Sequence, residues 1–126
     1  MAADAYLKVA ASNLQQAATA VKQSADQLRS EATNFKYRTD NDITTMQTEL
    51  KVRQLELDRA GDDAQRIAVL SARVQYLQTE INNKKTEVQQ KSASLEQEAR
   101  SKEGAMQDLK SQAQGLQQQA GDPTLR

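Results

Sequence analysis

LQQAATAVKQSADQLRSEATNF, the stretch from Leu14 to Phe35, repeats one pattern every seven residues. A large apolar residue stands at every seventh position, and a small residue follows each of them by four. This spacing places the side chains along one narrow stripe of an α-helix, which a second helix must cover. Extended in both directions, the large members are Leu7, Leu14, Val21, Leu28 and Phe35, and the small members are Ala11, Ala18, Ala25, Ala32 and Thr39.

The same stripe continues along the rest of the chain, and we call it the seam. Its steps of four and three residues alternate except at 35–39–43 and 77–81–85, where two steps of four follow each other. Such an insertion locally unwinds a left-handed supercoil. The further seam positions are Ile43, Met46, Leu50, Arg53, Leu57, Ala60, Ile67, Leu70, Val74, Leu77, Ile81, Lys85, Val88, Ser92, Leu95, Ala99, Lys102, Met106, Leu109, Ala113, Leu116 and Ala120.

The segment DRAGDDAQR, residues 58–66, predicts the turn between two helices. Gly61 can adopt the left-handed conformation that ends a helix. Asp62 is then the predicted N-cap of the next helix, and Gln65, three residues later, would close a capping box. Toward the C-terminus, Gly121 and Pro123 indicate the end of the second helix.

Folding the chain at Gly61 sets the two halves of the seam against each other in one register. Leu28 falls opposite Leu95, Ile43 falls opposite Ile81, and the two irregular steps face each other. We therefore expect an all-α fold, a long antiparallel two-helix coiled-coil hairpin that packs into a larger helical bundle. The predicted single domain spans 1–126, with helices near 4–60 and 63–120, a turn at 61–62 and a short tail at 121–126.

Two alternatives to a simple hairpin stay open at this point. Asp40, Asn41 and Asp42 are poor helix formers and good caps, so a break there would give a shorter three-helix bundle. The seam continues across 39–43, which favours an unbroken helix. Opening at Gly61 would instead give a swapped dimer, in which every seam pairing moves between chains.

Three basic residues, Arg53, Lys85 and Lys102, stand at seam positions. We expect their aliphatic stems to lie along the seam while the charged ends reach water. Gly104 and Gly115 each weaken the second helix by about 1 kcal/mol relative to alanine.

Composition excludes most other functions. Seventeen basic residues balance seventeen acidic ones, so the chain lacks the positive charge of a nucleic-acid binder. No apolar run approaches the roughly 18 residues of a membrane span, so no membrane insertion is expected. Without His or Cys, and with DNDITT (40–45) lacking a calcium loop's Gly and closing Glu, we expect no enzyme, metal or cofactor. No apolar signal-peptide core is present, which favours the cytoplasm and leaves export without a cleaved signal open.

Apolar residues facing away from the seam give the candidate site. At 100° per residue, Leu55 lies on the side of its helix opposite Leu50. A hairpin leaves such residues in water, so we expect another protein to cover them. The Gln-rich segment 112–119 is the second choice. The predicted interface residues are Tyr37, Val52, Leu55, Val69, Ala72 and Tyr76.

Two functions fit these features. The first is a structural protein that self-associates into an oligomer, bundle or filament. The second is an adaptor, chaperone or secreted helper that binds one helical partner. Small secreted helical hairpins of specialised bacterial secretion systems are similar in size and fold. They carry Trp-x-Gly at the turn and Tyr-x-x-x-Asp/Glu near the C-terminus. This turn is instead Arg59-Ala60-Gly61-Asp62, and Tyr76 to Glu80 has the second spacing only in mid-helix, so membership is not assigned.

Overall fold

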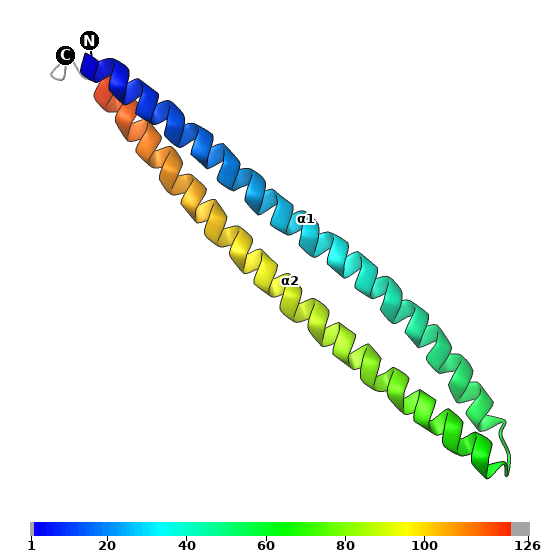
Figure 1. Cartoon of the computed structure of the whole chain (residues 1–126). Helices are drawn as coiled ribbons and strands as arrows, with labels where there is room; N and C mark the ends of the chain where they lie inside the picture. The colour runs from blue at the N-terminus through cyan, green and yellow to red at the C-terminus, as the bar shows by residue number, and fades with distance from the viewer. Residues whose placement is uncertain (1, 122–126) are drawn as a thin grey trace. The chain divides into compact units, whose positions relative to one another are not determined.

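The protein is an antiparallel hairpin of two long α-helices (Figure 1). The computed structural model describes residues 2–121. Helix α1 spans Ala2–Asp58 and helix α2 spans Ala64–Ala120. The predicted all-α hairpin is therefore confirmed. The turn is longer than the predicted 61–62, because α1 ends two residues before Ala60. Most of the predicted tail lies outside the described residues.

Helix α1 continues without a break through residues 40–42, so the three-helix alternative is wrong. Seam residues on both sides of this polar segment, Thr39 and Ile43, are 6% and 7% exposed. Their packing against α2 outweighs the low helix propensity between them. In addition, the Thr44 hydroxyl donates a hydrogen bond to the Asp40 carbonyl at 2.9 Å, a bond that the helical backbone allows.

The turn contains one predicted feature and one correction. Gly61 has a φ of 62°, the left-handed conformation predicted for it, although it lies three residues after the last residue of α1. The N-cap of α2 is Asp63 rather than Asp62, because its Oδ1 accepts a hydrogen bond from Arg66 N at 3.1 Å. The predicted capping box of Asp62 and Gln65 is therefore wrong, since the cap lies one residue later, at Asp63. The cap must directly precede the first helical residue, which the longer turn moves to position 64.

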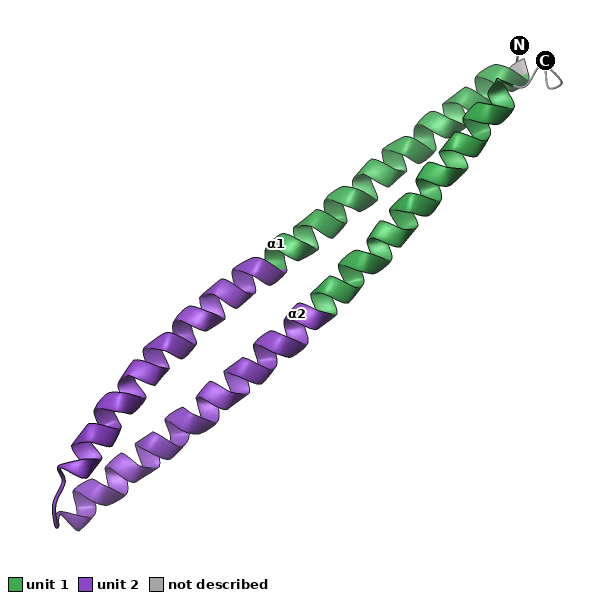
Figure 2. Cartoon of the chain, turned by 180° about the vertical axis from the view of Figure 1, so that it is seen from behind, with its two compact units in different colours: residues 1–31, 94–126 green, residues 32–93 purple. Residues whose placement is uncertain are grey.

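The contacts divide the hairpin into two compact units, shown in different colours in Figure 2. Unit 1 contains residues 1–31 and 94–126, and thus both chain ends. Small seam residues of unit 1 are almost completely buried, which lets two helix axes approach closely. These are Ala11, Ala18, Ala25, Ala99 and Ala113, each at most 1% exposed.

Unit 2 contains residues 32–93 and the turn. Its core uses larger aliphatic residues from the same seam. Leu77, at 1% exposed, is the largest side chain of the described residues that is less than 2% exposed. Branched and long apolar side chains fill the space between the helices here. The buried members are Ile43, Leu70, Leu77, Ile81 and Val88.

One basic seam residue of unit 2 differs from the prediction. Lys85 is exposed, whereas Lys84 is half-buried and places its Nζ 4.0 Å from Asp42 Oδ2 on α1. The irregular step of the second helix therefore falls at 84–88–92 rather than at 77–81–85. Lys84, three residues after Ile81, has its ammonium group beside the Asp42 carboxylate on α1. Lys85, four residues after Ile81, is exposed. The other two basic seam residues are half-buried, as expected.

Candidate protein-interaction surface

Apolar side chains of unit 2 face solvent on both helices. We call the six predicted interface residues the outer stripe. Val52 is the least exposed of its large side chains at 44%, and Tyr37 is the most exposed at 69%. Side chains of this size lose the benefit of burial when they face water. All six residues, Tyr37, Val52, Leu55, Val69, Ala72 and Tyr76, are exposed, and their role in binding stays a prediction.

An ion pair between the helices places two of these residues on one side of unit 2. Arg73 on α2 contacts Glu49 on α1, with Nη2 2.8 Å from Oε1. Val52 follows Glu49 by three residues, and Tyr76 follows Arg73 by three, so each shares a helix face with a member of the pair. The Arg73 guanidinium also lies 5.1 Å from the centre of the Tyr76 ring. Val52 and Tyr76 therefore flank the ion pair.

A second contact adds Val69 to this surface. We call this surface, formed by Glu49, Val52, Val69, Arg73 and Tyr76, the Arg73 side. Arg66 Nη2 lies 3.9 Å from Glu56 Oε2 across the hairpin, and Val69 follows Arg66 by three residues. Arg53 joins the two contacts, since it lies 3.8 Å from Glu49 and 2.5 Å from Glu56. Three guanidinium groups thus meet Glu49 and Glu56, and Asp63 lines the same groove as Arg66.

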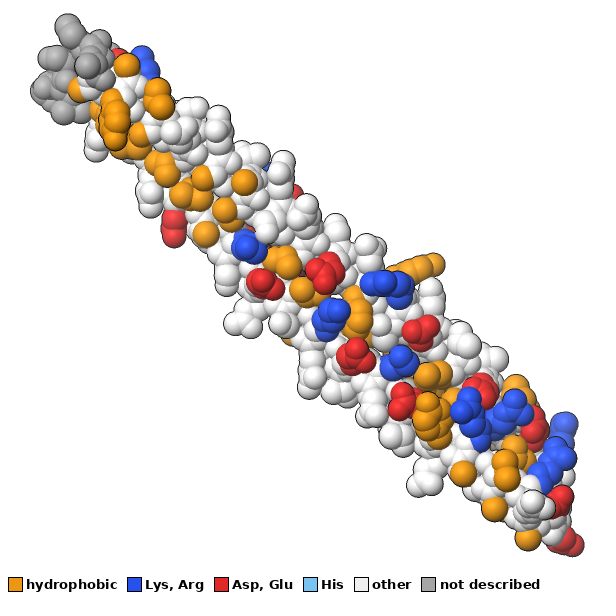
Figure 3. Space-filling view, in the orientation of Figure 1, with side chains coloured by type: hydrophobic (Ala, Val, Ile, Leu, Met, Phe, Trp, Pro, Cys, Tyr) orange, Lys and Arg blue, Asp and Glu red, His pale blue; other side chains and the backbone are white. Residues whose placement is uncertain are grey.

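Tyr37 and Leu55 lie on the outer edge of α1, and Leu55 adjoins the Arg73 side because it follows Val52 by three residues. They are separated by 18 residues, which is five full turns of an α-helix, so they point in the same direction. Figure 3 shows one face of the molecule, where charged side chains gather near the turn beside hydrophobic ones. The outer stripe therefore has a charged part shared by both helices and an apolar part on α1 that adjoins it at Leu55.

Unit 1 contains a separate ionic cluster. Arg29 on α1 donates from Nε and Nη2 to the two carboxylate oxygens of Glu96 on α2, at 3.2 Å each, and also pairs with Glu103. The hydrogen bond with Glu96 raises the pKa of Arg29. The same bond with Arg29 lowers the pKa of Glu96. Bidentate pairing between helices fixes their relative register, and it is a structural role.

Sequence reasoning missed two exposed apolar residues of unit 1. Tyr6 is 75% exposed and Val9 is 60% exposed, and both lie on the first turns of α1. They stand on either side of the seam residue Leu7, whereas the predicted outer stripe begins only at Tyr37. Their signal in the sequence is an apolar residue that falls between seam positions.

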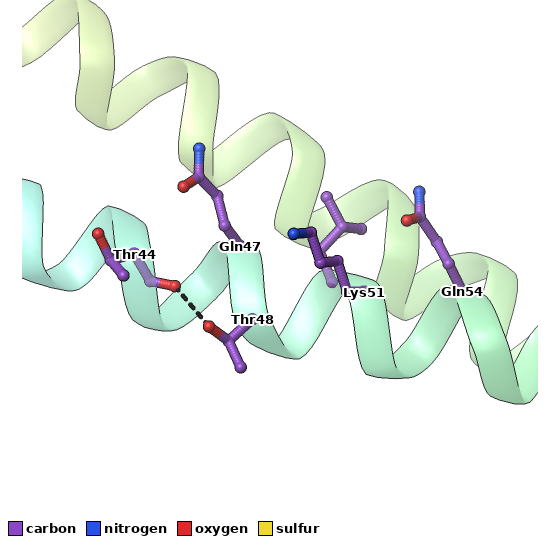
Figure 4. Close-up of a pocket in the computed structure, with 6 residues that line it drawn as sticks. Thr44, Gln47, Thr48, Lys51 and Gln54 are labelled. Carbon is purple, nitrogen blue, oxygen red and sulfur yellow. Dashed lines mark hydrogen bonds between the residues drawn. The ribbon is translucent and has the colours of Figure 1, made fainter.

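The grooves along the helices are polar and shallow. The groove in Figure 4 lies on α1 in unit 2, and the Thr48 hydroxyl beside it donates to the Thr44 carbonyl at 3.0 Å. Gln47 and Gln54 project to one side of the helix, and Thr48 projects to the other. Lys51 is the one titratable side chain among the lining residues, so the groove offers neither an acid–base pair nor an apolar pocket for a ligand.

Over residues 2–121, no three His, Cys, Asp or Glu side chains converge in a way that would hold a metal ion. Neither helix, over its described length, is apolar enough to cross a membrane. Comparisons with known protein families, with curated proteins and with solved structures found no match to this chain.

Proposed function

We propose that this chain is a non-enzymatic assembly protein that associates with further copies of itself through the outer stripe of unit 2. One observation carries the proposal. Large apolar side chains are exposed on both helices of a unit whose own core is only one seam wide. Covering them with another helical surface would add the apolar burial that two helices alone cannot provide.

The charge pattern supports a second copy as the partner. The whole chain is neutral, with 17 basic and 17 acidic residues, so copies do not repel one another through net charge. The Arg73 side alternates guanidinium and carboxylate groups along its length. Two such surfaces can pair opposite charges at the rim of an apolar contact, and closed symmetric association is the commonest form of oligomer.

An adaptor that binds a different helical protein is the second candidate. The long contact of Arg66 favours it, because this guanidinium approaches Glu56 only to 3.9 Å. A partner helix with an acidic residue beside its apolar face would complete this contact. Sedimentation of the purified protein over a range of concentrations separates the candidates. A dimer or larger particle supports assembly, whereas a monomer at every concentration supports the adaptor.

The direct test is the double variant Leu55→Asp with Tyr76→Asp. Each substitution places a charge where an apolar contact is proposed, and loss of one large anchor costs an interface more than about 1 kcal/mol. Together the two should weaken association at least about 30-fold. Circular dichroism should show unchanged helix content, because both side chains are about half exposed.

The matched control is Tyr6→Asp with Val9→Asp, which places the same charges at exposed apolar residues of unit 1. This control should associate like the unaltered protein. Normal assembly of the unit 2 variant would contradict the proposal. Loss of assembly in the control alone would place the contacts at the chain ends instead.

A further inference from the structure

The turn of the hairpin is held only by local contacts. Ala60 N donates to Leu57 O at 3.2 Å, and Asp63 N donates to Ala60 O at 3.3 Å. A Cβ atom on Gly61 would meet nothing within 4 Å, and of the turn residues 59–63 only Ala60 is half-buried. Its conformation therefore depends on its own few residues rather than on the core.

Seam positions continue across this turn. Leu57, Ala60, Ala64 and Ile67 are spaced by three, four and three residues, and the next step, to Leu70, is again three, which locally overwinds a continuous supercoil. If residues 59–63 were helical, α1 and α2 would join into one helix with one continuous stripe. In the hairpin, Leu57, Ala60 and Ile67 are half-buried and Ala64 is exposed. Ala64 is thus the member of this group that the hairpin leaves uncovered.

We propose that a second copy of this chain can replace the intramolecular partner by exchanging helices. Two chains open at 59–63, each forms one continuous helix, and α1 of each chain covers α2 of the other. The antiparallel register is kept, so the seam contacts of both units are retained between chains. Around the twofold axis, Ala60 of one chain meets Ala64 of the second copy. This inference uses the seam and does not rest on the outer stripe.

Three residues of the turn oppose the exchange. Gly61 and Asp62 are poor helix formers, so a continuous helix is weakest where it must be made. Asp63 caps α2 through Arg66 N only when the helix begins at Ala64, and a continuous helix has no use for this cap. The turn sequence therefore sets the balance between a closed monomer and an exchanged dimer.

Gly61→Ala tests this balance because it should destabilise the closed hairpin and stabilise the continuous helix. The closed turn holds residue 61 at a φ of 62°, which is strained for alanine, while the continuous helix favours alanine over glycine. Both effects count once per chain, so the dimer dissociation constant in sedimentation equilibrium should fall about 400- to 20,000-fold. The control is Gly115→Ala, which is helical in both forms and has an open space at its Cβ, so the constant should not change.

A crosslink distinguishes exchange from association side by side. With cysteines at Leu28 and Leu95 in the Gly61→Ala background, oxidation of the isolated dimer should join two chains. Crosslinks within single chains of that dimer would overturn the proposal. A Gly61→Ala protein with full helix content that stays monomeric at every concentration would also overturn it. Asp63→Ala provides a second, milder variant, which removes the cap and should shift the equilibrium in the same direction.

Discussion

The phase of the seam is tested most directly by truncating one buried and one exposed leucine in unit 2. Leu77 is 1% exposed, and Leu55 is 54% exposed. Leucine-to-alanine substitutions in a well-packed core cost about 2–5 kcal/mol, because apolar burial is lost and a cavity remains. Water can reach a core between only two helices, so we expect Leu77→Ala to lie at the lower end, near 2–3 kcal/mol. For Leu55→Ala we expect less than about 1 kcal/mol in the monomer.

The assay is urea unfolding followed by circular dichroism, at a concentration where sedimentation shows a monomer. The dependence of the free energy on urea should be the same in both variants, since truncating one side chain changes little of the area exposed on unfolding. If Leu55→Ala destabilised the monomer as much as Leu77→Ala, the assignment of seam and outer faces in unit 2 would be refuted. Working with the monomer matters because loss of assembly would add to the cost at Leu55.

The remaining predictions concern polar and glycine positions. Ser92 Oγ is buried without a hydrogen-bond partner among the described residues. Ser92→Ala should therefore raise the free energy of unfolding by about 1–2 kcal/mol. The control is Ser94→Ala at an exposed position, which should raise it by only about 0.5 kcal/mol through helix propensity. Gly115→Ala should stabilise by about 1 kcal/mol in the same urea assay. Arg29 lowers the pKa of Glu96, so this carboxylate stabilises the fold above its unfolded-state pKa and loses that effect as the pH falls through its folded-state pKa. The difference in stability between the protein and Glu96→Gln should therefore be largest at neutral pH and vanish in acid.

The antiparallel hairpin could be predicted because one repeat determines both helices and their register. Besides the end of α1, which is two residues earlier than predicted, the errors of the prediction are shifts of one residue between neighbours of the same type. Asp62 and Asp63 are equally good caps by composition, and only the place where α2 begins selects Asp63. Likewise, Lys84 rather than Lys85 occupies the seam, and its Nζ lies 4.0 Å from Asp42 Oδ2 on α1. Sequence periodicity along one helix contains no information about such contacts with the other.

The exposure of the outer stripe followed from helix phase alone. The grouping of residues from both helices on one side did not, because Val52 and Tyr76 are assigned to one side only through the ion pair of Glu49 with Arg73. Two charges on different helices pair only if they lie at the same height along the hairpin and on the same side of it. The sequence pattern of one helix determines neither condition. The candidate site was thus predictable as a set of residues and unpredictable as a surface.

The alanine seam of unit 1 has a consequence for which substitutions this chain can accept. Ala25 and Ala99 are 0% exposed, so a larger side chain there has no space and must push the helices apart, at a typical cost of about 1–3 kcal/mol. In unit 2, Leu77 and Ile81 instead suffer from becoming smaller. Sequence change is therefore limited in opposite directions along the same helix: an upper limit on side-chain size applies near the chain ends, and a lower limit applies toward the turn.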